Sequence, residues 1–217
     1  MFTGLVESVG ILRARQRRGP GARLTIDTGL APLVDGESIA VQGVCLTVDR
    51  VLPTGFEADA SGETLDRTTL GGLAVGAKVH LERAVPLGGR MGGHIISGHV
   101  DGVVRLVARE VLGEALRLCF GVPKDLARFV AEKGSVAIDG VSLTVNGAEA
   151  DRFDVVIIPH TQGATHLGAL RVGQDSNLEV DVLARYVERL LSSPSEGAHP
   201  SADERLTAKL RAAGFLQ

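Results

Sequence analysis

The chain has 217 residues, which is enough for one or two domains. A net charge of −3, 3% aromatic residues and no tryptophan give no basis for binding nucleic acid or an anionic membrane. Two cysteines are too few for a disulfide framework, no apolar run approaches membrane-spanning length, and the opening residues lack the features of a signal peptide. We therefore expect a reduced, cytoplasmic protein.

Two stretches of the sequence repeat each other. Gly43-Val44-Cys45-Leu46-Thr47-Val48 returns as Gly140-Val141-Ser142-Leu143-Thr144-Val145, displaced by 140 − 43 = 97 residues. Leu81-Glu82 and Leu178-Glu179 keep that displacement, whereas Thr3-Gly4 precedes Ser97-Gly98 by 94, so one insertion of three explains the difference. Chance similarity does not hold register over such a span. The sequence predicts a duplicated domain, with copies at residues 1–93 and 94–180.

Short apolar runs between Gly, Pro and Asp turn signals predict six strands in each copy. In the first copy these are Leu5 to Leu12, Arg23 to Ile26, Ser38 to Val41, Cys45 to Val51, Phe56 to Ala60 and Lys78 to Glu82. In the second they are Val100 to Val107, Ala115 to Phe120, Ser135 to Ile138, Ser142 to Val145, Phe153 to Ile158 and Ser176 to Val180. Short strands without long intervening helices favour an all-β fold with antiparallel barrels or sandwiches.

Turns and short helices connect these strands. The basic cluster Arg13 to Arg18 leads into Gly19-Pro20-Gly21, which indicates a solvated hairpin turn rather than a patch for polyanions. Short helices are predicted over Thr64 to Leu70 and Pro123 to Val130. Four glycines in the linker Pro86 to Gly93 indicate either flexibility or backbone conformations that only glycine tolerates.

The C-terminus changes character after the second copy. An apolar stripe at helical spacing predicts an amphipathic helix over residues 181–192, with Asp181 as its N-cap. Because this stripe lies outside both repeats, burial against another subunit is favoured over packing on its own barrel. Residues 193–217 form a tail, in which Ser201 to Leu216 is predicted to be a last amphipathic helix.

The two copies differ where chemistry is expected. The first has a thiol at Cys45 where the second has a hydroxyl at Ser142. Equivalent pockets with unequal reactive groups suit an enzyme that handles two similar molecules in different roles. The alternative is an ordinary duplication in which both residues are small parts of the core, since a fold alone does not imply a function.

Five stretches together resemble the riboflavin synthase family. They are Met1 to Glu7, Gly43 to Val48, Gly92 to Gly102, Lys133 to Val145 and Ala184 to Leu190, and the resemblance covers residues 1–192. It implies two six-stranded Greek-key barrels and a C-terminal helix that assembles a homotrimer. It also implies a dismutation without metal or cofactor, in which one dimethyl-ribityllumazine donates a four-carbon unit to a second one bound at the same site.

The resemblance also implies which residues form each pocket. For the N-terminal barrel they are Gly4, Leu5, Val6, Cys45, Leu46, Thr47, Asp59, Ala60, Ser61, Gly62, Glu63 and Thr64. For the C-terminal barrel they are Gly98, His99, Val100, Lys133, Ser142, Leu143, Thr144, Ile158, Pro159, His160, Thr161, Gln162 and Gly163. Backbone amides and Thr hydroxyls can pair with the edge of a pteridine, while Lys133 and Ser61 are suited to ribityl hydroxyls.

Eight residues match positions tied to activity in that family: Cys45, Ser142, His99, Asp181, Ser38, Asp139, His94 and Phe2. Cys45 is either a small buried hydrophobe or a thiol that assists proton transfer or addition to the ring. His94 and His99 make a weak metal site, because no carboxylate or third His accompanies them at ligand spacing. Asp181 is a helix N-cap, a group near the reacting centre, or both.

Some positions depart from the family pattern. His160 stands where a Glu is usual, His166 where a Thr is usual, and Gln42 where an Asn is usual, which leaves the contacts of His160 and Gln162 open. Lumazine-binding antenna proteins are the alternative, because they share the duplicated barrel and bind a lumazine or flavin without catalysis. The presence of Ser142, His99, Asp181 and the C-terminal helix favours the enzyme.

Overall fold

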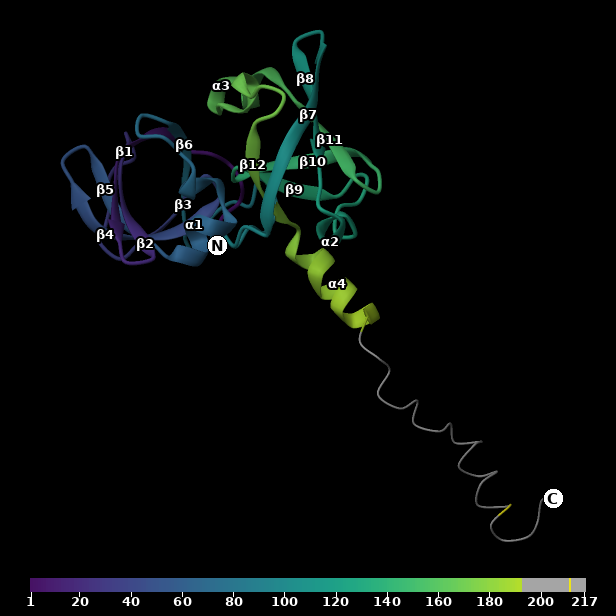
Figure 1. Ribbon diagram of the computed structural model, residues 1–217, viewed down its shortest axis with the longest axis horizontal. Helices are drawn as coiled ribbons and strands as arrows, with labels where there is room; N and C mark the ends of the chain where they lie inside the picture. The colour runs from purple at the N-terminus through teal and green to yellow at the C-terminus, as the bar shows by residue number, and fades with distance from the viewer. Residues whose placement is uncertain (193–210, 212–217) are drawn as a thin grey trace. The chain divides into compact units, whose positions relative to one another are not determined.

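The computed structural model describes residues 1–192 and residue 211 (Figure 1). The predicted tail at 193–217 and its terminal helix therefore lie outside the described residues, Arg211 excepted. The chain forms a compact unit over Met1–Arg185 and a second over Tyr186–Gln217. Within the described part, no helix is both long and apolar enough to cross a membrane.

Six antiparallel strands close each of two barrels. The strands are labelled in Figure 1. The first contains β1 (Ser8–Arg18), β2 (Gly21–Asp27), β3 (Ser38–Val41), β4 (Val44–Leu52), β5 (Gly55–Ala60) and β6 (Lys78–Arg83). The second contains β7 (Gly102–Leu112), β8 (Ala115–Gly121), β9 (Ser135–Ile138), β10 (Val141–Ala148), β11 (Arg152–Ile157) and β12 (Asp175–Val180).

The strand order is the same in both barrels. The ring β1-β2-β5-β4-β3-β6 becomes β7-β8-β11-β10-β9-β12 in the second copy, and every pairing is antiparallel. Each order places the fifth strand between the second and the fourth, which is a Greek-key arrangement. The prediction of two tandem six-stranded barrels is confirmed.

Short helices connect the strands, and one longer helix ends the described segment. They are α1 (Gly62–Arg67), η1 (Thr69–Gly71), α2 (Lys124–Ala127), α3 (Pro159–Ala164), η2 (Leu167–Ala169) and α4 (Val182–Ser192). The N-terminal end of α4 is capped as predicted, because the Leu183 amide donates to Asp181 Oδ1 at 2.9 Å.

Alternation along each strand separates core from surface. On β4, Val44, Leu46 and Val48 are buried in the core of the first barrel, whereas Cys45 and Thr47 point outward. β10 repeats this pattern and places Ser142 outward. The residues with chemical interest therefore lie on the outer faces of the barrels, outside the packed interiors.

Several predicted element boundaries differ from the structure. Leu5 and Val100 precede the strands they were expected to begin, because the residues before Ser8 and Gly102 contact the opposite barrel. β1 runs on through the Arg13 to Arg18 cluster, and the predicted hairpin turn lies at Gly19-Pro20 as expected. The helix expected over Pro123 to Val130 is the single turn α2.

Reciprocal hydrogen bonds join the two barrels. Phe2 and Ile96 exchange backbone hydrogen bonds of 2.7 and 3.1 Å. At the adjoining turns, a Cβ on Gly43 would lie 2.6 Å from the Gly140 amide nitrogen, and one on Gly140 would lie 2.7 Å from the Gly43 nitrogen. Both residues have positive φ, so the contact between the two turns requires glycine on each side.

A buried polar cluster continues this joint between the barrels. His80 Nδ1 lies 2.9 Å from the Asp139 carbonyl oxygen, and its Nε2 accepts from the His166 amide at 2.9 Å. In the repeat-equivalent half, Asn177 donates to the Gln42 carbonyl oxygen at 2.9 Å and accepts from the Thr69 amide at 2.7 Å. The unusual Gln42 and His166 thus belong to the joint between the barrels, where His166 stacks on His80 with ring centroids 3.8 Å apart.

Candidate active site

A cavity of about 540 Å³ lies on the outer face of the first barrel. Its lining includes Cys45, Thr47 and Asp49 from β4, and Asp59 from β5. Ser61 and Thr64 complete it from the start of α1, where Ser61 Oγ accepts from the Thr64 amide at 3.1 Å. The N-cap of this helix therefore fixes the two hydroxyl groups at one edge of the cavity.

Cys45 is held from the opposite copy. Its amide donates to the Gly98 carbonyl oxygen at 2.9 Å, and a Cβ on Gly98 would lie 2.5 Å from Cys45 Cβ. Cys45 also packs against a small core formed by Phe2, Ala40, Ile96 and Ala137. Gly98, which was predicted for the C-terminal pocket, therefore contacts Cys45 of the first barrel.

The reciprocal contact positions Ser142. Its amide donates to the Gly4 carbonyl oxygen at 2.9 Å, and a Cβ on Gly4 would lie 2.5 Å from Ser142 Cβ. Val6 packs against the core of the second barrel, and Val100 against that of the first. Each leading segment thus contacts the other barrel, Gly4 and Val6 the second one and Gly98 and Val100 the first.

Two buried carboxylates hold these crossing segments, and the sequence reasoning did not select them. Glu82 accepts from the Thr3 amide at 2.6 Å and the Gly4 amide at 2.9 Å. Glu179 accepts from the amides of Ser97 at 2.7 Å and Gly98 at 3.0 Å. Burial raises the pKa of both carboxyls, and the donated hydrogen bonds oppose that rise. The sequence feature that could have identified these two acids is their recurrence after Leu81 and Leu178 at the repeat spacing.

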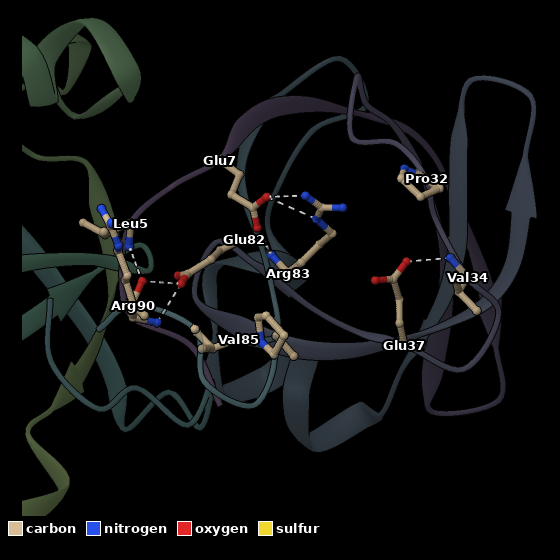
Figure 2. Close-up of a pocket in the computed structure, with 13 residues that line it drawn as sticks. Leu5, Glu7, Pro32, Val34, Glu37, Glu82, Arg83, Val85 and Arg90 are labelled. Atoms are coloured by element: carbon tan, nitrogen blue, oxygen red, sulfur yellow. Dashed lines mark hydrogen bonds and ion pairs between the residues drawn. The ribbon is translucent and has the colours of Figure 1, made fainter. Parts of the chain in front are cut away.

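Figure 2 shows a second cavity of the first barrel, of about 610 Å³, lined by Leu5, Glu7, Glu82, Arg83 and Arg90 among others. Arg83 Nη2 donates to Glu7 Oε2 at 2.8 Å in its wall. Leu5 is 51% exposed there.

His94 and Ser142 form a close side-chain pair beside the second barrel. His94 Nδ1 lies 2.7 Å from Ser142 Oγ, and its Nε2 is buried without a hydrogen-bond partner. Burial lowers the pKa of His94, and the charge of Asp181 opposes this. Gly93 permits the approach, since a Cβ there would lie 2.0 Å from the Thr3 carbonyl oxygen. This linker glycine is thus required by a close contact.

His99 lies apart from that pair. It is exposed and lines a cavity of about 320 Å³ together with Arg67, Asp101 and Arg185. Asp101 holds the end of β12, because the Val180 amide donates to its Oδ2 at 2.7 Å, and Arg185 donates to its Oδ1.

Several predicted site residues have other contacts. Phe2 and Asp139 are buried at 0% and 1% exposure; Asp139 Oδ1 accepts from the Asn177 amide at 2.8 Å. Glu63 forms an exposed ion pair with Arg67 at 3.2 Å. Gln162 donates to the Glu114 carbonyl oxygen at 2.7 Å, which attaches α3 to the β7–β8 hairpin. These four side chains belong to the framework around the cavities.

The remaining predicted residues lie as follows. Ala60 is buried in the first core and Gly62 contacts Pro20. Ser38 pairs with Thr47 across β3 and β4, on the face of the N-terminal cavity. Of the other residues predicted for the C-terminal pocket, Leu143 and Thr144 lie on β10, Ile158 is the N-cap of α3, and Lys133 precedes β9 with a positive φ. Pro159, His160, Thr161 and Gly163 lie on α3. Among the described residues, no group of three His, Cys, Asp or Glu side chains is arranged to hold a metal ion.

Comparisons with known proteins show the same duplication. The lumazine binding domain family matches residues 3–84 and again 97–181. Riboflavin synthase from Mycobacterium bovis is 50% identical over 201 residues, which are 89% of this chain and 99% of the relative. The Bacillus subtilis enzyme of the same name is 37% identical over 198 residues, covering 90% and 92%.

Among solved structures, the fold is similar to that of LumP complexed with riboflavin. The TM-score is 0.75 at 27% identity, over 83% of this chain and 99% of that one. The two family matches and the extended identity to curated enzymes give one conclusion. The chain belongs to the riboflavin synthase family, with two copies of the lumazine binding domain.

Proposed function

We propose that the protein forms riboflavin by dismutation of two molecules of 6,7-dimethyl-8-ribityllumazine. One lumazine gives up a four-carbon unit and leaves as 5-amino-6-(ribitylamino)uracil, and the other accepts that unit and becomes riboflavin. The observation that supports this proposal most strongly is the pair of residues Cys45 and Ser142. They occupy repeat-equivalent outward positions, and each is fixed by a glycine carbonyl oxygen from the other copy. Two like pockets with unlike reactive groups fit two copies of one substrate in unequal roles.

The polar lining fits a pteridine with a ribityl chain. In the N-terminal cavity, Thr47, Ser61 and Thr64 supply hydroxyls beside the Cys45 thiol. At the second site, Ser142 Oγ exchanges a proton with substrate, and His94 Nδ1 at 2.7 Å takes up or returns it. Asp181 stabilises the protonated imidazole by its charge.

The proposal includes a homotrimer joined by α4. The helix exposes Leu183, Tyr186, Val187, Leu190 and Leu191, each between 55% and 81%. Such an apolar stripe is typical of an interaction surface. A pocket of one subunit then faces a pocket of the neighbouring subunit, which brings two lumazines together. The two free cysteines are consistent with the reducing cytoplasm as the site of action.

The testing experiment is incubation of the purified full chain with dimethyl-ribityllumazine after exhaustive chelation and dialysis. Riboflavin and the pyrimidine product are expected in equal amounts. Activity that disappears on chelation and returns with a metal ion would contradict a dismutation carried by the protein alone. Lumazine binding without riboflavin formation would support the second candidate, a non-catalytic binding protein, which the structural likeness to LumP keeps in view.

A further inference from the structure

An arginine on the first barrel holds two acids at the rim of the N-terminal cavity. Arg23 on β2 lies directly opposite Asp59 on β5. Its Nε donates to Asp59 Oδ1 and its Nη2 to Oδ2, both at 2.8 Å. This two-pronged geometry fixes the carboxylate in position and orientation.

The second acid reaches the same guanidinium through a bulge. Asp49 is the residue that interrupts the register between β4 and β5, and a bulge redirects its side chain. Asp49 Oδ2 lies 2.5 Å from Arg23 Nη2. Asp49 and Asp59 line the cavity with half of each side chain exposed, whereas the Arg23 side chain is only 14% exposed.

Both acids bind the Arg23 guanidinium in this arrangement. The hydrogen bonds from Arg23 lower the pKa of the Asp59 carboxyl. Asp49 ion-pairs with the same guanidinium. The cavity wall thus presents oxygen atoms that only accept hydrogen bonds.

The second barrel keeps the arginine but lacks the acids. Arg117 lies opposite Val156, and Asn146 occupies the equivalent bulge. The nearest carboxylate on β11 is Asp154, whose Oδ2 is 3.6 Å from Arg117 Nε. Lys133 stands where the first copy has Gly36, which lines the N-terminal cavity. The two rims therefore differ in charge at equivalent places.

We propose that Asp49 and Asp59, positioned by Arg23, select neutral hydroxylated ligands for the N-terminal pocket and exclude phosphorylated ones. Ribityl hydroxyls donate hydrogen bonds to a carboxylate, whereas a phosphate has oxygens of the same charge and is repelled. The C-terminal pocket, with Asn146, Val156 and Lys133, has no such barrier. The inference rests on the proposed function, since it assumes that both barrels bind the lumazine or flavin.

The test compares riboflavin with flavin mononucleotide, which differs from it by one phosphate. Titration of the full chain, followed by flavin fluorescence, gives the number of sites for each ligand. The wild type is expected to bind riboflavin at both pockets and flavin mononucleotide at one. In D49N/D59N the N-terminal pocket should bind flavin mononucleotide as a second site. Its affinity for this ligand should be about tenfold or more above that of the wild-type N-terminal pocket. The transplant N146D/V156D is expected to remove the site that the wild type retains.

Two further variants separate positioning from general charge. Arg23→Lys keeps the positive charge but loses the two-pronged contact, so riboflavin affinity at the N-terminal pocket should fall while selectivity weakens. Asp175→Asn removes an acid from another arginine pair, in which Arg105 Nε lies 2.7 Å from Asp175 Oδ1. Because Asp175 lies outside both flavin pockets, this control should keep the wild-type numbers of sites.

Unchanged site numbers in both D49N/D59N and N146D/V156D would overturn the inference. If those variants still make riboflavin from lumazine, the proposed function stands despite that result. Conversely, a wild type that counts two riboflavin sites and one mononucleotide site but forms no riboflavin would support the selectivity and contradict the enzyme.

Discussion

At the scale of residues, the proposed chemistry depends on two repeat-equivalent positions that carry different reactive atoms. Cys45 and Ser142 present sulfur and oxygen at matched places, and each backbone amide is bound by the opposite copy. A thiol sulfur is softer and more polarisable than a hydroxyl oxygen, so the two pockets carry unequal reactive groups. This difference gives two identical substrates different treatment.

Cys45→Ser makes the two pockets alike and should lower kcat about a hundredfold or more, with little change in KM. The reason is that the thiol contributes to a proton transfer or addition step and little to binding. Steady-state kinetics with lumazine would measure both constants. Ser142→Ala is the matched comparison in the second pocket. Turnover of the Cys45 variant at the parent rate would make the residue a packing group only.

The His94–Ser142 pair predicts a particular pH profile. Burial lowers the pKa of His94, so its imidazole remains neutral until the pH falls clearly below 6.5. The acid limb of kcat/KM should therefore lie below that value, and it should vanish in His94→Asn along with most activity. An unchanged acid limb in the variant would show that another group titrates.

Sequence reasoning could match residues between copies but could not place the crossing segments. Because Cys45 and Ser142 are repeat equivalents, the sequence alone does not show which of their two amides binds the Gly4 carbonyl oxygen. The buried acids Glu82 and Glu179 each bind the leading segment of their own copy, and that segment then contacts the other barrel.

At the scale of elements, the strands were predictable where turn residues mark both ends. β3 and β9 have the expected bounds, because Gly36 and Gly134 precede them and tight turns follow. β1 and β7 begin later than expected and run to their hairpin tips. Val6 and Val100, which precede these strands, pack on the other barrel, a tertiary cause that a local pattern does not contain.

The joint between the barrels predicts an acid-sensitive element. His80 Nε2 accepts a hydrogen bond, so the ring must be neutral with its proton on Nδ1. Burial lowers its pKa to about 3, ahead of repulsion from His166. The unfolded chain binds this proton near pH 6.5, so stability from His80 is complete above that pH and declines as the pH falls toward 3.

His80→Asn should remove that dependence while keeping the joint. Asn177 makes the equivalent two hydrogen bonds in the other half, so an amide at position 80 can replace them. Urea unfolding should give similar stabilities at pH 8, and at pH 4.5 the variant should gain roughly 2 kcal/mol relative to wild type. Burial raises the pKa of Asp139 to about 7, so its contribution to stability increases as the pH falls. Because Asp139 is present in both proteins, this contribution cancels when the variant is compared with the wild type. Parallel pH curves for the two proteins would contradict the assignment.

At the scale of the whole molecule, assembly is expected to depend on α4 beyond its first turn. Arg185 binds Asp101 and lies 5.2 Å from the centroid of the Phe129 ring, so a chain ending at Arg185 keeps the second barrel intact. It loses the apolar side chains from Tyr186 to Leu191. This truncation should give folded monomers that bind lumazine but form riboflavin orders of magnitude more slowly. A chain ending at Ser192 is the control and should behave as the full chain.

Light scattering and turnover measured on one sample would decide the matter. Monomers with near-parental turnover would show that one chain builds the whole site. Trimers without Tyr186 to Leu191 would show that another surface joins the copies.

The central claim is that two unlike pockets, contributed by two different subunits, make one reacting site. Mixing Cys45→Ser with His94→Asn chains, followed by dissociation and reassembly, tests it most directly. Each variant alone is damaged in one pocket, but a mixed trimer contains sites that combine two intact pockets. Random mixing should restore about a quarter of the parental turnover. A mixture no more active than the average of the two variants would contradict a site shared between copies.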